Sequence, residues 1–191
     1  AIQEAYHVYI KHGLESKNTN QIAVLEIGFG TGLNSFITFL EAQKKKLLIE
    51  YVGVDAYPVL QEELEKLNYV AELDATHAAE IFKKLHLCSW EEKHQITSDF
   101  SLLKRKQFFH EIDDENKFDL IYFDAFGARV QPELWTEEIF KKMFLALKPQ
   151  GVLVTYAAKG SVRRAMQSVG FAVERLPGPP GKREMLRAVK V

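Results

Sequence analysis

Cysteine is nearly absent from this chain: Cys88 is the only one among 191 residues. A single thiol excludes an internal disulfide and a cysteine-rich metal site, and it fits the reducing cytoplasm, where we expect the protein to work. The six histidines are scattered without metal-ligand spacing, so we expect no bound metal. No apolar run approaches the roughly 20 residues of a membrane-spanning helix, and we expect no contact with a membrane.

The charges are distributed unevenly along the chain. The formal net charge is −1, from 25 basic and 26 acidic residues. Residues 149–191 hold 8 of the basic and 2 of the acidic residues, a net charge of +6, which leaves 17 basic and 24 acidic residues, or −7, in residues 1–148. A basic C-terminal part is a hint of a polyanionic partner such as a nucleic acid. The alternative is a solvated basic face.

Apolar segments typical of strands alternate with helical patterns, which predicts an α/β fold with a mostly parallel sheet and helices on both faces. The length and the 47% hydrophobic content are those of a single globular domain, residues 1–191. Seven strands are expected, near 22–27, 51–54, within 94–107, 118–123, 151–156, 171–176 and 184–190. Helices are expected near 33–45, 58–67, 74–87, 135–147 and 160–169. The last two strands flank a stiff Pro-Gly loop and should form an antiparallel pair.

The segment 24–34, Val-Leu-Glu-Ile-Gly-Phe-Gly-Thr-Gly-Leu-Asn, is the most informative stretch. An apolar strand runs into three glycines spaced two apart, and a helical pattern follows. Such a turn lets a cofactor lie against the strand end and the start of the next helix. The spacing differs from the G-x-G-x-x-G of dinucleotide folds and resembles the glycine motif of class I S-adenosyl-L-methionine (SAM) methyltransferases. The cofactor-binding residues expected here are Glu26, Gly28, Phe29, Gly30, Thr31, Gly32 and Asn34.

A second acid completes the cofactor signature. Asp55 ends a short buried strand one helix and one strand after the glycine turn. A carboxylate at this position accepts hydrogen bonds from two ribose hydroxyls. This contact alone suits NAD equally well, and the glycine spacing favours SAM.

The third strand has two possible positions. If residues 94–97 form it, Asp99 lies at its end, where SAM-dependent methyltransferases often keep an acid near the adenine. If residues 102–106 form it, that acid is missing, and Phe108 or Phe109 is placed to line the adenine pocket. The sequence leaves both alternatives open.

The segment 118–127 is the second strong signal. Six residues suit a buried strand, and Asp124 stands at its carboxyl end, the edge where open α/β sheets bind ligands. In methyl transfer to nitrogen the amine must be neutral and aimed, and Asp124 can accept its hydrogen bond and help to remove its proton. Phe126 can stack on a base extruded into the pocket. Their alternatives are a loop cap for Asp124 and a core aromatic for Phe126.

Seven segments together resemble the methyltransferase domain of the MnmC family, bacterial enzymes that complete 5-methylaminomethyl-2-thiouridine at the tRNA wobble position. The likeness covers most of the chain and is weakest between about 60 and 110. Where the family often has Asp-Ala-Phe-Ala-Pro, this chain has Asp-Ala-Phe-Gly-Ala-Arg. The matching segments are 4–10, 28–34, 124–126 with 132–136, 140–151, 155–164, 170–171 and 178–186.

The resemblance implies a SAM-dependent N-methyltransferase that converts 5-aminomethyl(-2-thio)uridine in tRNA to 5-methylaminomethyl(-2-thio)uridine. It also implies an upstream FAD-dependent oxidase, which is fused to the methyltransferase in bifunctional members. Because this chain holds no second glycine-rich fingerprint, we expect either a stand-alone methyltransferase with a separate oxidase or a piece of a longer protein. Basic residues are expected to meet tRNA phosphates, which position a nucleic acid rather than specify it. These residues are Lys159, Arg163, Arg164, Lys182 and Arg183.

Three other functions are compatible with the same fold. A SAM-dependent methyltransferase for a small amine would use the same Asp124 and need no basic surface. A polyamine synthase of the aminopropyl-transfer type would need an additional acidic cluster for a multiply charged amine. A non-catalytic SAM-binding subunit would need neither Asp124 as a base nor an acidic cluster.

Overall fold

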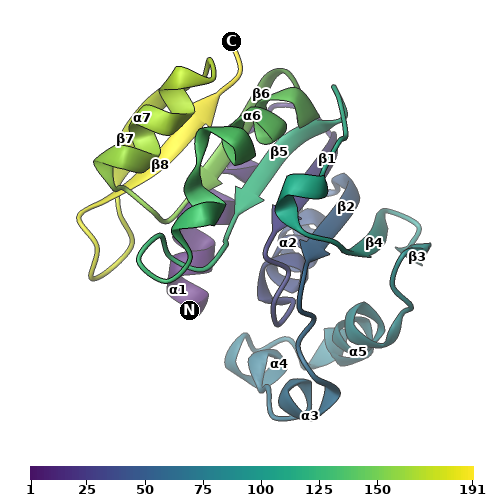
Figure 1. The fold of residues 1–191 in the computed structure, drawn as a ribbon. Helices are drawn as coiled ribbons and strands as arrows, with labels where there is room; N and C mark the ends of the chain where they lie inside the picture. Colours follow the sequence, from purple (N-terminus) through teal and green to yellow (C-terminus); the bar gives the residue numbers. More distant parts are fainter.

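The computed structural model describes every residue from Ala1 to Val191. Eight strands form one sheet in the order β3-β4-β2-β1-β5-β6-β8-β7 (Figure 1). The strands are β1 (Gln21–Ile27), β2 (Leu48–Asp55), β3 (Lys93–Thr97), β4 (Phe100–Lys106), β5 (Phe118–Phe123), β6 (Leu147–Thr155), β7 (Ala172–Pro177) and β8 (Glu184–Val189). The predicted class, a mostly parallel α/β sheet with an antiparallel C-terminal pair, is confirmed.

The helices alternate with these strands along the chain. The α-helices are α1 (Ile2–Ala5), α2 (Leu33–Lys45), α3 (Gln61–Leu64), α4 (Tyr69–Glu72), α5 (Ala79–Leu87), α6 (Glu137–Ala146) and α7 (Gly160–Ser168). A π-helical turn, η1 (Tyr6–Lys11), follows α1 directly. The short 3-10 turns are η2 (Leu14–Ser16), η3 (Thr76–Ala78), η4 (Phe109–Glu111) and η5 (Pro132–Trp135). No helix is both long and apolar enough to cross a bilayer.

The sheet has one strand more than the seven predicted, because residues 93–106 form two strands. β3 pairs antiparallel with β4, with an irregular register between Gln95 and Thr97. β4 pairs in parallel with β2, from Ile49 opposite Phe100 to Asp55 opposite Lys106. Thus β4 takes the position beside β2 that the sequence left open, and β3 is an added edge strand.

Alternation along each strand divides the core between the two faces of the sheet. On β1, Ile22 and Val24 belong to a buried cluster with η1, α2 and α5. Leu25 and Ile27, whose side chains point the other way, belong to a second cluster with α6 and α7. The predicted covering of both faces by helices is therefore confirmed.

The segment between β2 and α5 departs most from the predicted helices. Helices were expected over 58–67 and 74–87, whereas α3 and α4 have four residues each and α5 begins at Ala79. Neither α3 nor α4 contains a buried residue. Helices draw most of their stability from packing of an apolar face, so these sequences form single turns.

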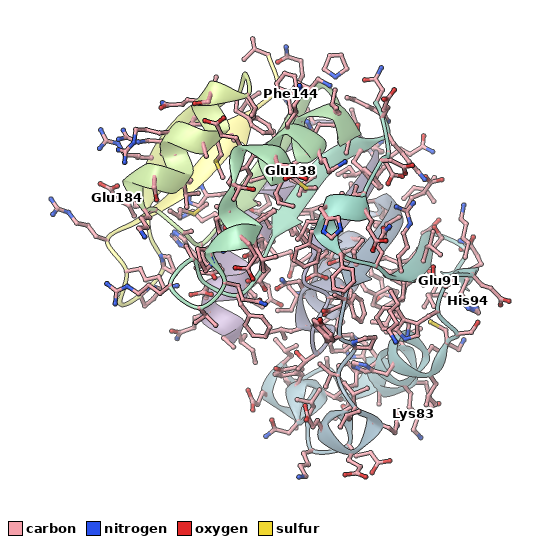
Figure 2. All side chains as sticks on the ribbon, viewed as in Figure 1. Lys83, Glu91, His94, Glu138, Phe144 and Glu184 are labelled. Atoms are coloured by element: carbon pink, nitrogen blue, oxygen red, sulfur yellow. The ribbon has the colours of Figure 1, made fainter.

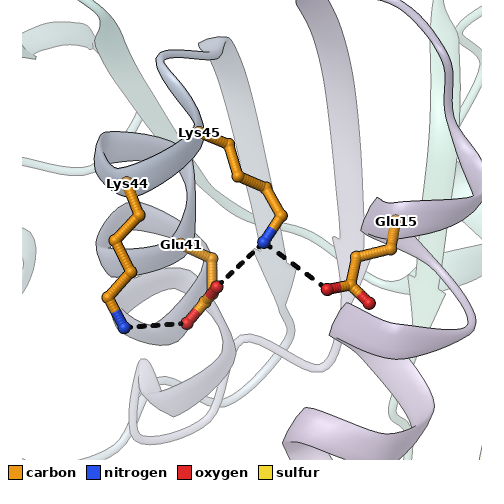
Figure 3. Close-up of polar contacts among 4 residues, drawn as sticks. All are labelled: Glu15, Glu41, Lys44 and Lys45. Carbon is orange, nitrogen blue, oxygen red and sulfur yellow. Dashed lines mark hydrogen bonds and ion pairs between the residues drawn. The ribbon is translucent and has the colours of Figure 1, made fainter.

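The long helix α2 has the predicted bounds, and both ends are fixed. Gly32 precedes it in a left-handed conformation, and Lys46 ends it in the same conformation. Near its C-terminus, Glu41 pairs with Lys44 and Lys45, and Lys45 also reaches Glu15 of η2 at 3.4 Å (Figure 3). Cations at a helix C-terminus also interact favourably with the helix dipole. These contacts join α2 to the N-terminal segment.

Candidate active site

A cavity of about 910 Å³ opens at the carboxyl edge of the sheet. The strand order reverses between β1 and β5, and this switch point is where open α/β sheets bind ligands. The cavity is lined by nine of the residues predicted from the sequence: Glu26, Gly28, Phe29, Gly30, Thr31, Asn34, Asp55, Asp124 and Phe126.

The three glycines of the turn have different roles. Gly28 has φ +91°, and a Cβ there would lie 2.5 Å from the carbonyl oxygen of Asp124. Gly30 has φ +53°, and its added Cβ would meet only the carbonyl oxygen of Gly28, at 3.8 Å, so this position is open on the cavity side. Gly32 caps α2, faces His86, and does not line the cavity. The predicted cofactor role of Gly32 is thus indirect: it starts the helix.

The side chain of Phe29 packs into the protein. A Cβ on Gly53 of β2 would collide with ring atom Cδ1 of Phe29, so the ring needs a glycine beneath it. The ring also meets Trp90 edge-on, at 6.1 Å between centroids. Phe29 therefore supports the glycine turn from below.

Asp55 ties the glycine turn to the end of β2. Its Oδ2 accepts a hydrogen bond from the N–H of Gly30 at 2.8 Å. Burial raises the pKa of this carboxyl above its ordinary value, and the backbone N–H groups of Gly30 and Tyr57 oppose the rise. Since Oδ1 has only a long contact of 3.4 Å to the N–H of Tyr57, it is free to accept hydrogen bonds from a diol.

Asp124 is held from two sides. The Tyr9 hydroxyl donates to its Oδ1 at 2.9 Å, and the Asn34 amide donates to its Oδ2 at 3.0 Å. Burial raises the pKa of Asp124 to about 6, while these two hydrogen bonds act to lower it. The carboxyl group is thus mostly ionised at neutral pH, yet it can bind a proton at little cost.

Glu26 extends this network beneath the cavity. It is 1% exposed and accepts hydrogen bonds from Tyr51 at 2.7 Å and from Asn34 at 2.8 Å. Burial raises its pKa well above the ordinary value. The Asn34 amide nitrogen thus bridges Glu26 and Asp124, which links the glycine strand to the strand that carries the candidate base.

The structure does not bring Asp99 to the cavity. It lies in the turn between β3 and β4, and its carbonyl oxygen accepts from the N–H of Ile49 near the start of β2. Because β3 runs antiparallel to β4, the end of β3 meets the amino edge of the sheet, opposite the cavity. Phe108 and Phe109, the alternative candidates, both line the cavity.

The basic residues predicted to meet tRNA lie outside the cavity. Lys159, Arg164 and Arg183 are exposed, Arg163 is half-buried, and none of the four forms an ion pair. Lys182 differs from these four. It pairs with Glu4 at 2.9 Å, and its ammonium lies 4.3 Å from the centroid of the Tyr156 ring. Arg164 does not pair with Glu174, because Arg187 pairs with that acid.

Several cavity residues were not predicted as site residues from the sequence, and four of them lie near Asp55 or Asp124. Glu4 and Tyr9 come from the N-terminal helical segment, Tyr57 follows Asp55, and Tyr156 follows β6. Glu4, Tyr9 and Tyr156 lie in segments 4–10 and 155–164, which resemble the MnmC family, but no spacing within these segments indicates a role for them. Only the fold, which brings residues 1–11 beside β5 and β6, places the first two here.

The fold and the cavity define an α/β methyltransferase, with a glycine turn and an acid for the cofactor and a second acid beyond them. A family described as S-adenosyl-L-methionine-dependent methyltransferase matches residues 68–191, more than half of the chain. The chain belongs to this family, and its cofactor is SAM. The match includes Asp124 and the basic C-terminal part, residues 149–191 (the basic tail), and it begins after the glycine turn.

Curated relatives match nearly the whole chain. It is 28% identical over 202 residues to the tRNA 5-methylaminomethyl-2-thiouridine biosynthesis bifunctional protein MnmC of Leptospira borgpetersenii, covering 97% of this chain. The protein of the same name from Hydrogenovibrio crunogenus is 26% identical over 199 residues, 96% of the chain. The chain spans only 30% and 29% of the length of these two relatives.

Solved structures share the fold. MNMC2 from Aquifex aeolicus superposes with a TM-score of 0.71 at 21% identity, covering 98% of this chain and 60% of that one. A SAM-dependent methyltransferase from the same organism gives a TM-score of 0.52 at 14% identity, with 89% and 82% of the two chains covered.

The cavity residues fit SAM. Gly30 leaves a position without a side chain at the cavity wall, and Asp55 keeps a free carboxylate oxygen for the ribose hydroxyls. Phe108 and Phe109 offer an apolar wall beyond Asp55. These residues, with Thr31 on the turn, would hold the cofactor.

Gly30→Ala tests whether a side chain at the cavity wall hinders SAM binding. The protein has room for the added methyl group, so only the left-handed backbone should cost stability, about 1 kcal/mol. We expect the SAM dissociation constant to rise at least tenfold by calorimetry, because the methyl group would occupy the cavity wall.

Gly181→Ala is the matched control. Gly181 has φ +88° and nothing within 4 Å of an added Cβ, so this variant has a similar backbone cost in a loop outside the cavity. Equal SAM affinity in both variants would contradict the placement of the cofactor beside Gly30.

Proposed function

We propose that this protein methylates the amine of 5-aminomethyl(-2-thio)uridine at the wobble position of tRNA, which gives 5-methylaminomethyl(-2-thio)uridine. The proposal depends most on one observation. Asp124, whose carboxylate is hydrogen-bonded through both oxygens, lines the same cavity as the exposed ring of Phe126. SAM supplies the methyl group, which a sulfonium makes electrophilic.

The pKa of Asp124 suits proton transfer from an amine. An alkylammonium group must lose a proton before its lone pair can attack, and a base with a pKa of about 6 is ionised at neutral pH. Asp124 attracts the cationic amine, accepts its hydrogen bond and takes the proton. Orientation by the fixed carboxylate supplies the remaining acceleration.

Phe126 is placed to receive a base. Its side chain is 72% exposed, whereas its carbonyl oxygen accepts a hydrogen bond from the indole N–H of Trp135 at 2.7 Å. The backbone is thus anchored while the ring stays open to solvent. An exposed aromatic ring beside a catalytic cavity suits stacking on an extruded nucleobase.

The names of the curated relatives and the basic C-terminal surface support tRNA as the substrate. Enzymes that act on tRNA meet it where it resides, so we also propose a cytoplasmic location. An FAD-dependent oxidase, in a separate protein or in the same longer chain, would supply the aminomethyl group by removing a carboxymethyl group upstream. The chain would act as one methyltransferase domain.

A second candidate, aminopropyl or methyl transfer to a polyamine, is favoured by one observation. Glu4, Glu133 and Glu138 line the same cavity as Asp124. Such carboxylates would also attract a small, multiply charged amine.

The decisive assay incubates the protein with deuterium-labelled SAM and tRNA that carries the unmethylated aminomethyl-uridine. Mass spectrometry of the wobble nucleosides should show the labelled methylamine. In single-turnover reactions Asp124→Asn and Asp124→Ala should each lose at least about 10²-fold in rate, the effect of removing a general base. SAM affinity should change by no more than a few-fold, and alanine should be the worse substitution.

Putrescine and spermidine serve as competing acceptors in the same assay. Label in a polyamine and none in tRNA would overturn the tRNA assignment. Near-wild-type rates in both Asp124 variants would remove this residue from the chemistry.

The triple variant Lys159→Ala, Arg163→Ala, Arg183→Ala should weaken tRNA binding. Each phosphate contact that is lost should reduce the slope of log affinity against log salt by about 0.7–0.9. Lys182 is left intact because it pairs with Glu4 at the cavity wall. Filter binding across a salt series measures both effects, and SAM affinity should stay constant.

A control triple variant replaces Lys66, Lys83 and Lys84, which are exposed and form no ion pair. Figure 2 shows Lys83 on the opposite side of the molecule from Glu184, the residue after Arg183. The control should bind tRNA like the parent. Equal salt slopes for all three proteins would show that the basic tail is only solvated.

A further inference from the structure

Tyr9 is one of the two side chains that donate a hydrogen bond to the candidate base, Asp124. Its hydroxyl lies 2.9 Å from Oδ1 of Asp124, and its side chain is 2% exposed. A second contact, to the carbonyl oxygen of Phe123, is longer at 3.4 Å. The Tyr9 hydroxyl has one proton to donate, and the shorter contact assigns it to the carboxylate of Asp124.

The chain positions Tyr9 through an unusual helical turn. Residues 6–11 form a π-helical turn, a geometry that is often found at functional sites. Gly13 allows this turn to close, because a Cβ there would collide with the carbonyl oxygen of Tyr9. The Tyr9 ring also packs against Tyr122 of β5, at 5.2 Å between centroids. The backbone and the ring are thus both fixed.

The hydrogen bond from Tyr9 has a defined direction. Burial raises the pKa of Tyr9 well above its ordinary value, so the phenol stays protonated and donates. An ionised carboxylate offers about four acceptor positions. Tyr9 takes one on Oδ1 and Asn34 takes one on Oδ2, which leaves a position on each oxygen for a substrate amine.

The other charged groups around Asp124 act from several elements. Glu4 of α1 raises its pKa, and Lys182 of the β7–β8 loop lowers it. Tyr156, whose own pKa rises to about 12, remains a neutral neighbour beyond β6. Glu26 of β1 reaches Asp124 only through the bridging amide of Asn34. Tyr9 is the only phenol that donates to Asp124.

We propose that Tyr9 is the positioning residue of this active site: its hydroxyl holds Oδ1 of Asp124 and keeps the carboxylate ionised and aimed into the cavity. The proposal rests on the proposed role of Asp124 as the base. Without this donor the carboxylate would ionise at a higher pH and rotate more freely. Tyr9 would act through Asp124 rather than on the substrate.

The test compares Tyr9→Phe with Tyr122→Phe. Tyr122 is an equally buried neighbour, but its hydroxyl pairs with Thr38 at 2.9 Å instead of with Asp124. The Asp124 carboxyl is titrated by NMR on ¹³C-aspartate-labelled protein and assigned with Asp124→Asn. Tyr9→Phe should raise the midpoint by about one pH unit, the size expected for a lost hydrogen bond to a charged group. Tyr122→Phe should leave it unchanged.

The pH profile of methyl transfer gives a second readout. In Tyr9→Phe the acid limb should move upward by the same amount as the NMR midpoint. The rate should fall about fivefold at pH 6, because the ionised fraction of Asp124 would drop from about one half to about one tenth. Raising the pH should restore part of the loss. Difluorotyrosine incorporated at position 9 is a stronger hydrogen-bond donor of similar shape, so it should move the acid limb to lower pH. This second test does not require Tyr9→Phe to fold.

An Asp124 midpoint that is the same in wild type, Tyr9→Phe and the difluorotyrosine protein would overturn the proposal. The titration needs no methyl acceptor, so it does not depend on the identity of the substrate. Failure of the wild-type protein to label tRNA would instead reject the proposed function alone.

Discussion

Three carboxylates withdrawn from water at one edge of the sheet govern the structure of the active site. Burying a charge is costly unless hydrogen bonds replace the lost water. Here Glu26, Asp55 and Asp124 each accept at least two hydrogen bonds from groups that the fold supplies. Placing these donors requires η1, the start of α2 and the glycine turn to stand where they do. The site and the fold therefore depend on one another.

The same constraint explains why the glycines and Asn34 have fixed positions. Gly28 brings the turn against the backbone of Asp124, and the N–H of Gly30 reaches Asp55. Asn34, in the first turn of α2, bridges the acids of β1 and β5. A change at any of these positions would disturb both the cofactor side and the acceptor side of the cavity.

Motifs that are contiguous in sequence predicted their structures well. The glycine turn, Asp55 and Asp124 lie at the ends of parallel strands, so strand order alone gathers them. The prediction failed where pairing between distant segments decides the outcome. Asp99 could be placed only by knowing that β3 turns back on β4, and Tyr9 only by knowing that residues 1–11 pack beside β5 and β6. Lys182 looked like a free cation because Glu4, its partner, is far away in sequence.

The central claim is that Asp124 is an ionised carboxylate held largely out of water, and its linkage to folding tests this directly. Its pKa is raised from the ordinary 3.8 to about 6 in the folded protein, so the folded state binds the proton more tightly than the unfolded state. In the wild type, the stabilisation that comes from tighter proton binding by folded Asp124 is fully present below pH 4. It is lost as the pH rises through 6. We expect denaturant unfolding to show that the free energy of unfolding of Asp124→Asn rises relative to wild type as the pH increases from 4 to above 6. The gain should reach about 3 kcal/mol, since each pKa unit corresponds to 1.36 kcal/mol. A stability difference that does not vary between pH 4 and pH 8 would contradict the account.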